Sequence, residues 1–240
     1  MQIKYLKSIN STNTYALDNF DELDDFMVIS ADVQTQGRGR FERKWVSSGG
    51  ENIYLSFVLK PENKSYVANF TQYLAVVLTK VLDSYDIQAT IKWPNDVLVR
   101  DKKISGILCE SKLAHNQVVG VVLGIGVNLN LSQDEIALID KPATSLNLEI
   151  NKKIEKQKFL LYLIKEFEKD YQNVVDFGFS YFKDEYFKRI EFLGKEVSIQ
   201  QRDGATREKY FVKSIDENGC LLVLDKNGVE KKIFSGDLMF

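Results

Sequence analysis

The stretch VLVRDKKISGILCESKLAHNQVVGVVLGIGVN, residues 97–128, decides the fold class. It holds three β-rich runs, at 97–100, 103–110 and 117–128, which follow one another with short turns and no intervening helix. Strands connected this directly form an antiparallel meander, because parallel neighbours need a long crossover connection. We therefore expect an α+β protein with a mixed or antiparallel β-sheet backed by helices.

Further strands and helices are predicted on both sides of this stretch. Residues 53–59 place Ile53, Leu55, Phe57 and Leu59 on one face, which is the period-two pattern of a strand. Two longer segments repeat apolar side chains at helical spacing and predict amphipathic helices. The predicted strands are 26–30 and 53–59, and the predicted helices are 66–85, 155–177 and 181–190, with Gly178 separating the last two.

The C-terminal part of the chain has a different pattern. From residue 194 onward, short β-like runs alternate with the dipeptides Asp203-Gly204, Asn218-Gly219, Asn227-Gly228 and Ser235-Gly236. Asn-Gly and Asp-Gly are typical of type I′ hairpin turns, whose two central residues need positive φ. The pattern predicts a small SH3-like β-barrel over 191–240, following a larger domain over 1–190.

Composition narrows the possible functions. The 240 residues include 44% hydrophobic and 28% charged residues, which is typical of a globular protein. Lys and Arg total 32 against 34 Asp and Glu, which argues against a generally basic nucleic-acid coat. His115 is the single histidine, so a multi-histidine zinc site is impossible. Cys109 and Cys220 are expected to be reduced, as in the cytoplasm. We expect no signal peptide and no membrane span.

A glycine- and arginine-rich segment, GRGRFERKW at residues 37–45, is the most distinctive motif. It holds four basic residues and one acidic residue, so its local charge is +3 in a chain of formal net charge −2. Guanidinium groups suit carboxylates and phosphates, and Trp45 offers a flat face for a base. The two glycines permit positive φ and close approach of the backbone. The motif fits a polyphosphate nucleotide and a second anionic substrate; the alternative is a solvated basic turn.

Two other segments hold polar side chains at predicted strand ends. In Lys92-Trp93-Pro94-Asn95-Asp96, the proline disfavours helix at Trp93, so a rigid corner would fix the directions of Lys92, Asn95 and Asp96. The alternative is a simple turn in which Asn95 and Asp96 bond their own backbone. Lys103 begins the next run and is either a functional cation or a solvated edge charge.

Glycines and small polar residues complete the candidate set. Gly124 and Gly126 lie within an apolar strand, where glycine indicates either close approach of a ligand or a bulge. The segment lacks the third glycine of a dinucleotide-binding fingerprint, and the chain has no Walker A motif. Ser11-Thr12-Asn13 precedes an apolar stretch and by itself reads as a helix N-cap.

In this order, the motifs resemble those of the biotin–protein ligases (biotin–acetyl-CoA-carboxylase ligases). The resemblance runs from about residue 5 to the C-terminus and includes Ser235-Gly236-Asp237. Because the chain begins almost at Ser11, it is expected to be a monofunctional ligase without the N-terminal DNA-binding domain of repressor-type members. The motifs are Ser11-Thr12-Asn13, Gln34-x-x-Gly37-Arg38-Gly39-Arg40-x-x-Arg43-x-Trp45, Lys92-Trp93-Pro94-Asn95-Asp96, Lys103-x-x-Gly106-Ile107 and Gly124-x-Gly126-x-Asn128.

The resemblance implies a class II synthetase-like catalytic domain at 1–190 that binds biotin and ATP. Such enzymes join biotin to ATP, forming biotinyl-5′-AMP and pyrophosphate, and then transfer biotin to a lysine of a biotin carboxyl carrier protein. Mg²⁺ would share the neutralisation of the phosphates. The implied setting is the cytoplasm, with no DNA or membrane partner and with a homodimer as one possible state.

The resemblance also implies roles for individual residues. Lys103, Arg40 and Asp96 would be catalytic: Lys103 would bond the reacting carboxylate and the α-phosphate, Arg40 would hold the phosphate and the closed loop, and Asp96 would receive or orient the carrier lysine. No protein ligand for a metal is assigned. The biotin-binding set is Ser11, Thr12, Gln34, Gly37, Arg38, Lys103, Gly106 and Gly124, and the ATP- or adenylate-binding set is Arg40, Arg43, Trp45, Lys92, Asn95 and Asn128, with Trp45 near the adenine.

Two other functions fit parts of the sequence. A related ligase on the same fold would load lipoate or another acyl acid, and its substrate would not need polar partners such as Ser11, Thr12 and Gln34. A non-enzymatic protein would use the basic segment to bind nucleic acid, with an affinity that falls steeply with salt and does not depend on ATP.

Overall fold

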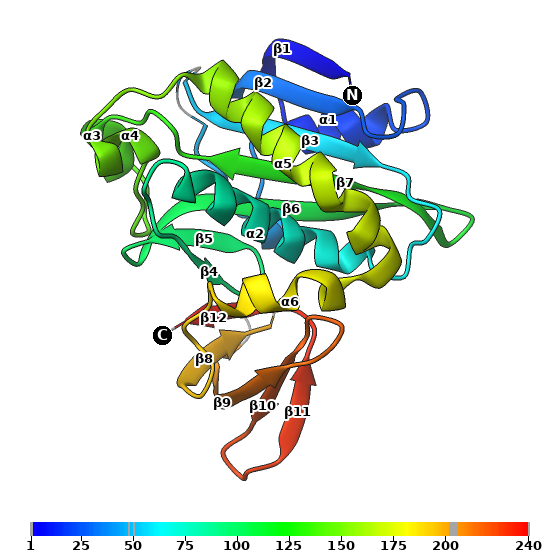
Figure 1. Ribbon diagram of the computed structural model, residues 1–240, viewed down its shortest axis with the longest axis vertical. Coiled ribbons are helices and arrows are strands. Elements are labelled where there is room, and N and C mark those ends of the chain that lie inside the picture. Colours follow the sequence, from blue (N-terminus) through cyan, green and yellow to red (C-terminus); the bar gives the residue numbers. More distant parts are fainter. Residues whose placement is uncertain (1, 48, 50, 202–205, 240) are drawn as a thin grey trace.

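Two β-sheets organise the protein in the computed structural model, which describes residues 2–47, 49, 51–201 and 206–239 (Figure 1). The larger sheet has the strand order β1-β2-β3-β7-β6-β5-β4. β1 and β2 are parallel, and every other neighbouring pair is antiparallel, which confirms the predicted α+β class with a mixed sheet. The strands are β1 (Ile3–Ile9), β2 (Val28–Gln34), β3 (Ile53–Leu59), β4 (Thr90–Lys92), β5 (Asp96–Val99), β6 (Lys102–Ala114) and β7 (Gln117–Val127).

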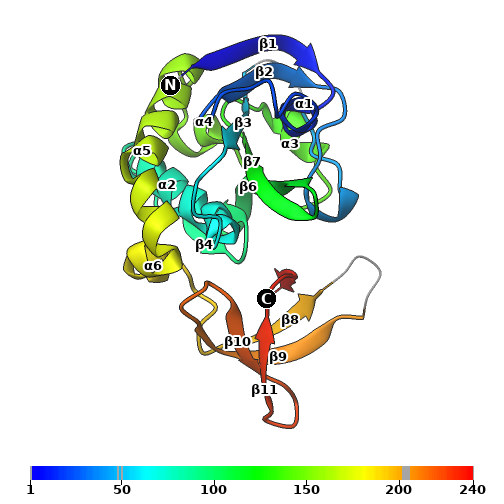
Figure 2. The ribbon, with the colours of Figure 1, turned by 90° about the vertical axis from the view of Figure 1, so that its right-hand side faces the viewer.

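Helices cover both faces of the larger sheet. The long helices α2 (Phe70–Asp83) and α5 (Lys156–Phe177), followed by α6 (Phe179–Phe187), pack on one face, and α1 (Thr12–Asp18) lies on the other (Figure 2). The shorter elements are the 3₁₀ turns η1 (Arg40–Glu42) and η2 (Val67–Asn69) and the helices α3 (Gln133–Ala137) and α4 (Leu146–Ile150). Among the described residues, no helix is both long and apolar enough to cross a membrane.

The core explains why β3 has no exposed face. The Phe57 ring stacks on Phe167 of α5, with centroids 4.4 Å apart. On the opposite face, Ala16 and Phe20 pack with Val58 and its neighbours. All seven residues of β3 are therefore buried, whereas the sequence indicated a single apolar face. The predicted bounds of β3 are confirmed, and the predicted helices agree with α2 and α5 to within a few residues.

The C-terminal sheet, residues 196–239, is antiparallel and has the order β11-β10-β9-β8-β12. Its order has β11 and β12 as the two end strands, and the described residues show no pairing between them. The sheet agrees with the predicted small β unit, while the boundary at 190/191 stays a prediction. The strands are β8 (Glu196–Gln200), β9 (Glu208–Ile215), β10 (Leu221–Leu224), β11 (Glu230–Ile233) and β12 (Asp237–Met239).

The turns of this sheet differ from the predicted type I′ hairpins. Gly219 and Gly228 have φ of 79° and 75°, but neither preceding asparagine has positive φ. Each turn instead starts at an aspartate: Gly219 N donates to Asp216 O at 3.0 Å, and Asp216 Oδ1 accepts from two backbone N–H groups. Ser235-Gly236 is not a hairpin turn, since β11 and β12 are not neighbours. Asp203-Gly204 lies outside the described residues.

The C-terminal sheet is docked on the larger sheet through the Asn218-Gly219 turn. The carbonyl O of Gly219 accepts from Nε1 of Trp93 at 3.1 Å and from Nε2 of Gln72 at 2.8 Å, and Asn69 Nδ2 donates to Asn218 O at 2.8 Å. The side chains of Trp93, Gln72 and Asn69 are buried. Trp93 of the predicted corner thus has a structural role, because its indole holds the C-terminal sheet.

Candidate active site

The N-terminal turn of α1 forms one wall of the site. Ser11 Oγ accepts from the backbone N of Thr14 at 3.4 Å, so Ser11 is the helix N-cap. The backbone N and Oγ1 of Thr12 lie 2.8 and 3.1 Å from Oε1 of Gln34, which accepts both hydrogen bonds. Gln34 Nε2 donates to Ser47 Oγ at 3.4 Å. The three residues predicted to face a ureido group therefore lie together, and the N-cap interpretation holds as well.

Asn13 is a buried residue that links α1 to β3 and β6, and the sequence predicted no role for it. Its Oδ1 accepts from Ser56 Oγ at 2.6 Å, and its Nδ2 donates to Leu108 O at 3.2 Å and to Oε2 of Glu110 at 2.8 Å. A Cβ on Gly124 would lie 2.0 Å from Asn13 Oδ1. Gly124 therefore lacks a side chain because Asn13 fills that space, and its predicted closeness to a ligand stays a prediction.

The basic segment 37–45 folds back on itself as a short hairpin. Gly39 N donates to Arg43 O at 2.7 Å, and Trp45 N donates to Gly37 O at 2.8 Å. The left-handed residue of the tip is Phe41, with φ of 57°, whereas Gly39 has φ of −114°. The two glycines permit positive φ, but neither adopts it here. Gly37 is needed for close approach, since its Cβ would lie 2.9 Å from Trp45 O.

Trp45 covers two paired glycines of the central strands. Gly106 of β6 lies opposite Gly126 of β7. Added Cβ atoms there would come within 2.9 and 2.5 Å of the Trp45 ring atoms Cζ3 and Cε2. Lys103 Nζ lies 5.4 Å from the centroid of the same ring. The indole Nε1 is buried without a hydrogen-bond partner among the described residues, so a ligand acceptor would satisfy it.

Lys103 and Asp96 meet at the start of β5. Lys103 Nζ lies 2.6 Å from Asp96 Oδ1, and both side chains are partly exposed. Asn95 Nδ2 donates to Ile107 O at 2.8 Å, which orients its Oδ1 toward Nη1 of Arg40 at 3.3 Å. At this corner Asp96 lies against Lys103 and Asn95 lies against Arg40, while the proposed contact of Asp96 with a carrier lysine stays a prediction.

The C-terminal sheet reaches the tip of the basic hairpin. Arg40 Nη1 donates to Gly236 O at 3.0 Å and its Nη2 donates to Ser235 Oγ at 2.7 Å. Arg40 lies 3.5 Å from Asp237, whose carboxylate also pairs with Arg43. The predicted phosphate-binding arginines are thus held by a carboxylate from the far end of the chain.

Arg38, at the base of the hairpin, faces the α1 wall instead. Its Nη2 donates to Glu110 Oε1 at 3.2 Å and to Thr14 Oγ1 at 3.1 Å. Because Glu110 also accepts from Asn13, one carboxylate ties the hairpin, α1 and β6 together. Sequence reasoning missed Glu110, and its only signal was a charged residue in an apolar strand.

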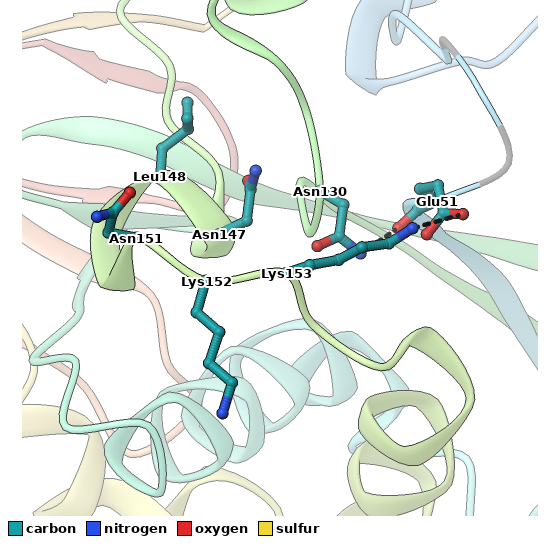
Figure 3. A pocket seen from close by; sticks show the side chains of 7 residues that line it. All are labelled: Glu51, Asn130, Asn147, Leu148, Asn151, Lys152 and Lys153. Atoms are coloured by element: carbon teal, nitrogen blue, oxygen red, sulfur yellow. Dashed lines mark hydrogen bonds and ion pairs between the residues drawn. The ribbon is translucent and has the colours of Figure 1, made fainter.

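Asn128 borders the site from the end of β7. It is 6% exposed, and its Nδ2 donates to Thr144 O at 2.9 Å. Beyond it, a cavity of about 390 Å³ is lined by the seven residues drawn in Figure 3, among which Lys153 pairs with Glu51 at 3.4 Å. That cavity contains none of the predicted site residues, and the candidate site is the surface around Trp45 and the hairpin.

Positive charge is concentrated at this surface. Burial lowers the pKa of the Arg40 guanidinium, although Asp96 opposes that shift. Burial is also the largest cause of the lowered pKa of Lys92, and the charges of Lys141, Lys103 and Arg43 lower it further. Cations that lower one another's pKa values in this way favour an anionic ligand. The arrangement joins a polar wall suited to a neutral polar group with a cationic surface suited to phosphates.

Comparison with known proteins assigns the family. The family model described as "Biotin/lipoate A/B protein ligase family" matches residues 5–128, which is more than half of the chain. The chain belongs to this family. The match covers the polar wall, the basic hairpin, Lys103 and the paired glycines.

Individual relatives extend the similarity beyond the family model. The chain is 32% identical over 214 residues to the bifunctional ligase/repressor BirA of Bacillus spizizenii, covering 88% of this chain and 65% of that relative. It is 29% identical over 226 residues to a biotin–[acetyl-CoA-carboxylase] ligase of Paracoccus denitrificans, covering 91% and 92%. The structure of a biotin protein ligase from Aquifex aeolicus in complex with biotin and ATP matches with a TM-score of 0.82 and 28% identity, covering 99% and 97%.

Proposed function

We propose that the protein activates biotin with ATP and transfers it to a lysine of a biotin carboxyl carrier protein. One juxtaposition supports this most directly: Lys103 Nζ lies over the Trp45 ring, and the polar wall of Thr12 and Gln34 reaches the backbone carbonyl of the same tryptophan through Ser47. A ureido ring needs hydrogen-bonding partners, and a triphosphate needs cations. The similarity to ligases that bind biotin and ATP runs over both regions.

In the first step, a biotin carboxylate oxygen attacks the α-phosphorus of ATP. The bond to the bridging oxygen breaks, and its electron pair leaves with pyrophosphate. Two anions must be brought together, so positioning and positive charge contribute more than proton transfer. Lys103 suits the attacking carboxylate and the α-phosphate, and its pairing with Asp96 at 2.6 Å fixes the direction of its side chain. Trp45, Asn95, Arg40 and Arg43 suit the nucleotide.

In the second step, a lysine amine of the carrier attacks the acyl carbon, and AMP leaves. The lysine ammonium loses two of its three protons as the amide forms, and Asp96 is the carboxylate placed beside the proposed carboxylate-binding lysine. The basic hairpin would shield the mixed anhydride from water while it waits for the carrier.

Mg²⁺ would enter with the nucleotide as part of the substrate. Among the described residues, no group of three or more His, Cys, Asp or Glu is placed to hold a metal ion. Phosphate oxygens are therefore its expected ligands, and it would supply additional positive charge during adenylation.

Calorimetry tests the proposal. Biotin, lipoate and then a non-hydrolysable ATP analogue are titrated into the chain, each also in the presence of the others. We expect biotin binding, tighter ATP-analogue binding once biotin is present, and no binding of lipoate. Lipoate binding without biotin binding would assign the other branch of the family. Salt-sensitive binding of nucleic acid without any response to biotin would assign the non-enzymatic function.

The remaining partners and the setting stay predictions. The cytoplasmic setting is supported by two free cysteines, Cys109 and Cys220. Homodimer formation is tested by light scattering with and without biotin, and the expected lack of DNA binding is tested by a mobility-shift titration.

A further inference from the structure

Two lysines at the edge of the site, Lys92 and Lys141, form no ion pair with a carboxylate among the described residues. Lys92 lies opposite Asp96 in the β4–β5 pairing. Lys141 leads into Pro142-Ala143, which runs beside Lys103: Lys103 N donates to Pro142 O at 2.9 Å, and Ala143 bridges to Lys103. Both lysines therefore approach the Lys103–Asp96 pair, one from each side.

The carboxylates of this surface pair with cations other than these two lysines. Asp96 pairs with Lys103, and Asp237 pairs with Arg40 and Arg43. Within the part of the chain that the structure describes, no carboxylate forms an ion pair with Lys92 or Lys141.

The lowered pKa of Lys141 also indicates that this lysine lies among other cations. Lost hydration and the positive charges of Arg43 and Lys103 lower its pKa, and Asp96 only partly opposes this. Lys141 is nevertheless exposed, so a ligand can reach it. A lysine that lies against other cations is stabilised when a multivalent anion binds among them.

We propose that Lys141, together with Lys92, binds the β- and γ-phosphates of ATP and holds the pyrophosphate as it leaves. This inference rests on the proposed function and extends it to Lys141, which none of the sequence motifs contains. Lys103 meets the α-phosphate, where the new bond forms. The two unpaired lysines would stabilise the charge that develops on the leaving group when the bond from the α-phosphorus to the bridging oxygen breaks.

The test compares two nucleotides that differ in those phosphates. Binding of α,β-methylene-ATP and of biotinol-AMP, a stable adenylate analogue without β- and γ-phosphates, is measured for the unmodified chain, Lys141→Gln and Lys92→Gln. Lys102→Gln is the matched control, because Lys102 is exposed and neighbours Lys103 in the strand. The KM for pyrophosphate in ATP–pyrophosphate exchange provides a second readout.

We expect Lys141→Gln to weaken binding of the ATP analogue about tenfold or more and to raise the KM for pyrophosphate by a similar factor. The affinity of Lys141→Gln for biotinol-AMP should change less than about twofold, and Lys102→Gln should change the affinity for neither ligand. Equal weakening of both nucleotides, or of neither, would overturn the inference. If the unmodified chain bound neither biotin nor biotinol-AMP, the proposed function itself would fail, and that result would not depend on any lysine variant.

Discussion

Gly124→Ala is expected to damage the protein through Asn13. The new Cβ would lie 2.0 Å from Asn13 Oδ1 and 2.8 Å from its Cγ, so the asparagine must move. Asn13 is 4% exposed and lies in the first turn of α1, where the chain has little freedom to shift. Movement breaks its hydrogen bonds with Ser56, Leu108 and Glu110.

The size of the effect follows from those three bonds. A buried hydrogen bond contributes roughly 1 kcal/mol, so losing all three lowers the free energy of unfolding by about 3 kcal/mol. Because Thr12 precedes Asn13 and bonds Gln34, displacement of α1 should also weaken biotin binding by about tenfold or more.

Urea unfolding and biotin calorimetry measure the two effects. Gly39→Ala is the matched control, because its Cβ would meet nothing closer than 3.6 Å and its φ suits alanine. The double variant Asn13→Ala with Gly124→Ala should be no less stable than Asn13→Ala alone, since the new methyl then fills vacated space. If Gly124→Ala matched the unmodified chain in stability and in biotin affinity, the assignment of Gly124 to the packing of Asn13 would be refuted.

Three further outcomes are expected. Lys103→Ala should lower biotin-dependent pyrophosphate release about a hundredfold while biotin still binds, because the charge it meets develops in the transition state; normal turnover would remove Lys103 from the mechanism. Arg40→Gly removes the side chain that joins the hairpin to Asn95, Ser235 and Gly236. The adenylate should therefore leave the site about tenfold faster and biotinylate a bystander protein, which a streptavidin blot detects. An unlabelled bystander and an unchanged rate of adenylate release would contradict the closed-hairpin interpretation. Burial raises the pKa of the Cys109 thiol to about 12, so iodoacetamide at pH 8 should modify Cys109 only after denaturation. Rapid labelling of Cys109 in the folded chain, located by peptide mapping, would show that this thiol is accessible.

Local chemistry made much of the site predictable. The types of residue that hold a ureido group, a phosphate or a transferring carboxylate are few, and they occur here as short motifs. Thr12 and Gln34 meet because the paired strands β1 and β2 end together, with Thr12 starting α1 just after β1 and Gln34 closing β2. Lys103 meets Asp96 because the two lie on the paired strands β6 and β5, each near the start of its strand. Asn95 likewise reaches the hairpin through Arg40.

Contacts between distant segments were not predictable in the same way. Glu110 reads as one charge in an apolar strand, and Asp237 reads as part of a C-terminal turn. Only the folded chain brings Glu110 to Arg38 and Asn13, and brings Asp237 to Arg40 and Arg43. Lys141 has no motif at all, and its place depends on the pairing of Ala143 with Lys103.

The sequence by itself determined the fold class, the main helices and strands and the chemistry of the motifs, because periodicity and residue type act locally. The tertiary structure decided which face of each strand is buried, why Gly124 and Gly219 have no side chain, and which carboxylate balances each arginine. Those features depend on the order and register of strands that are far apart in the chain. A one-residue change of register would turn every side chain of a strand to the opposite face, and no local pattern fixes that alignment.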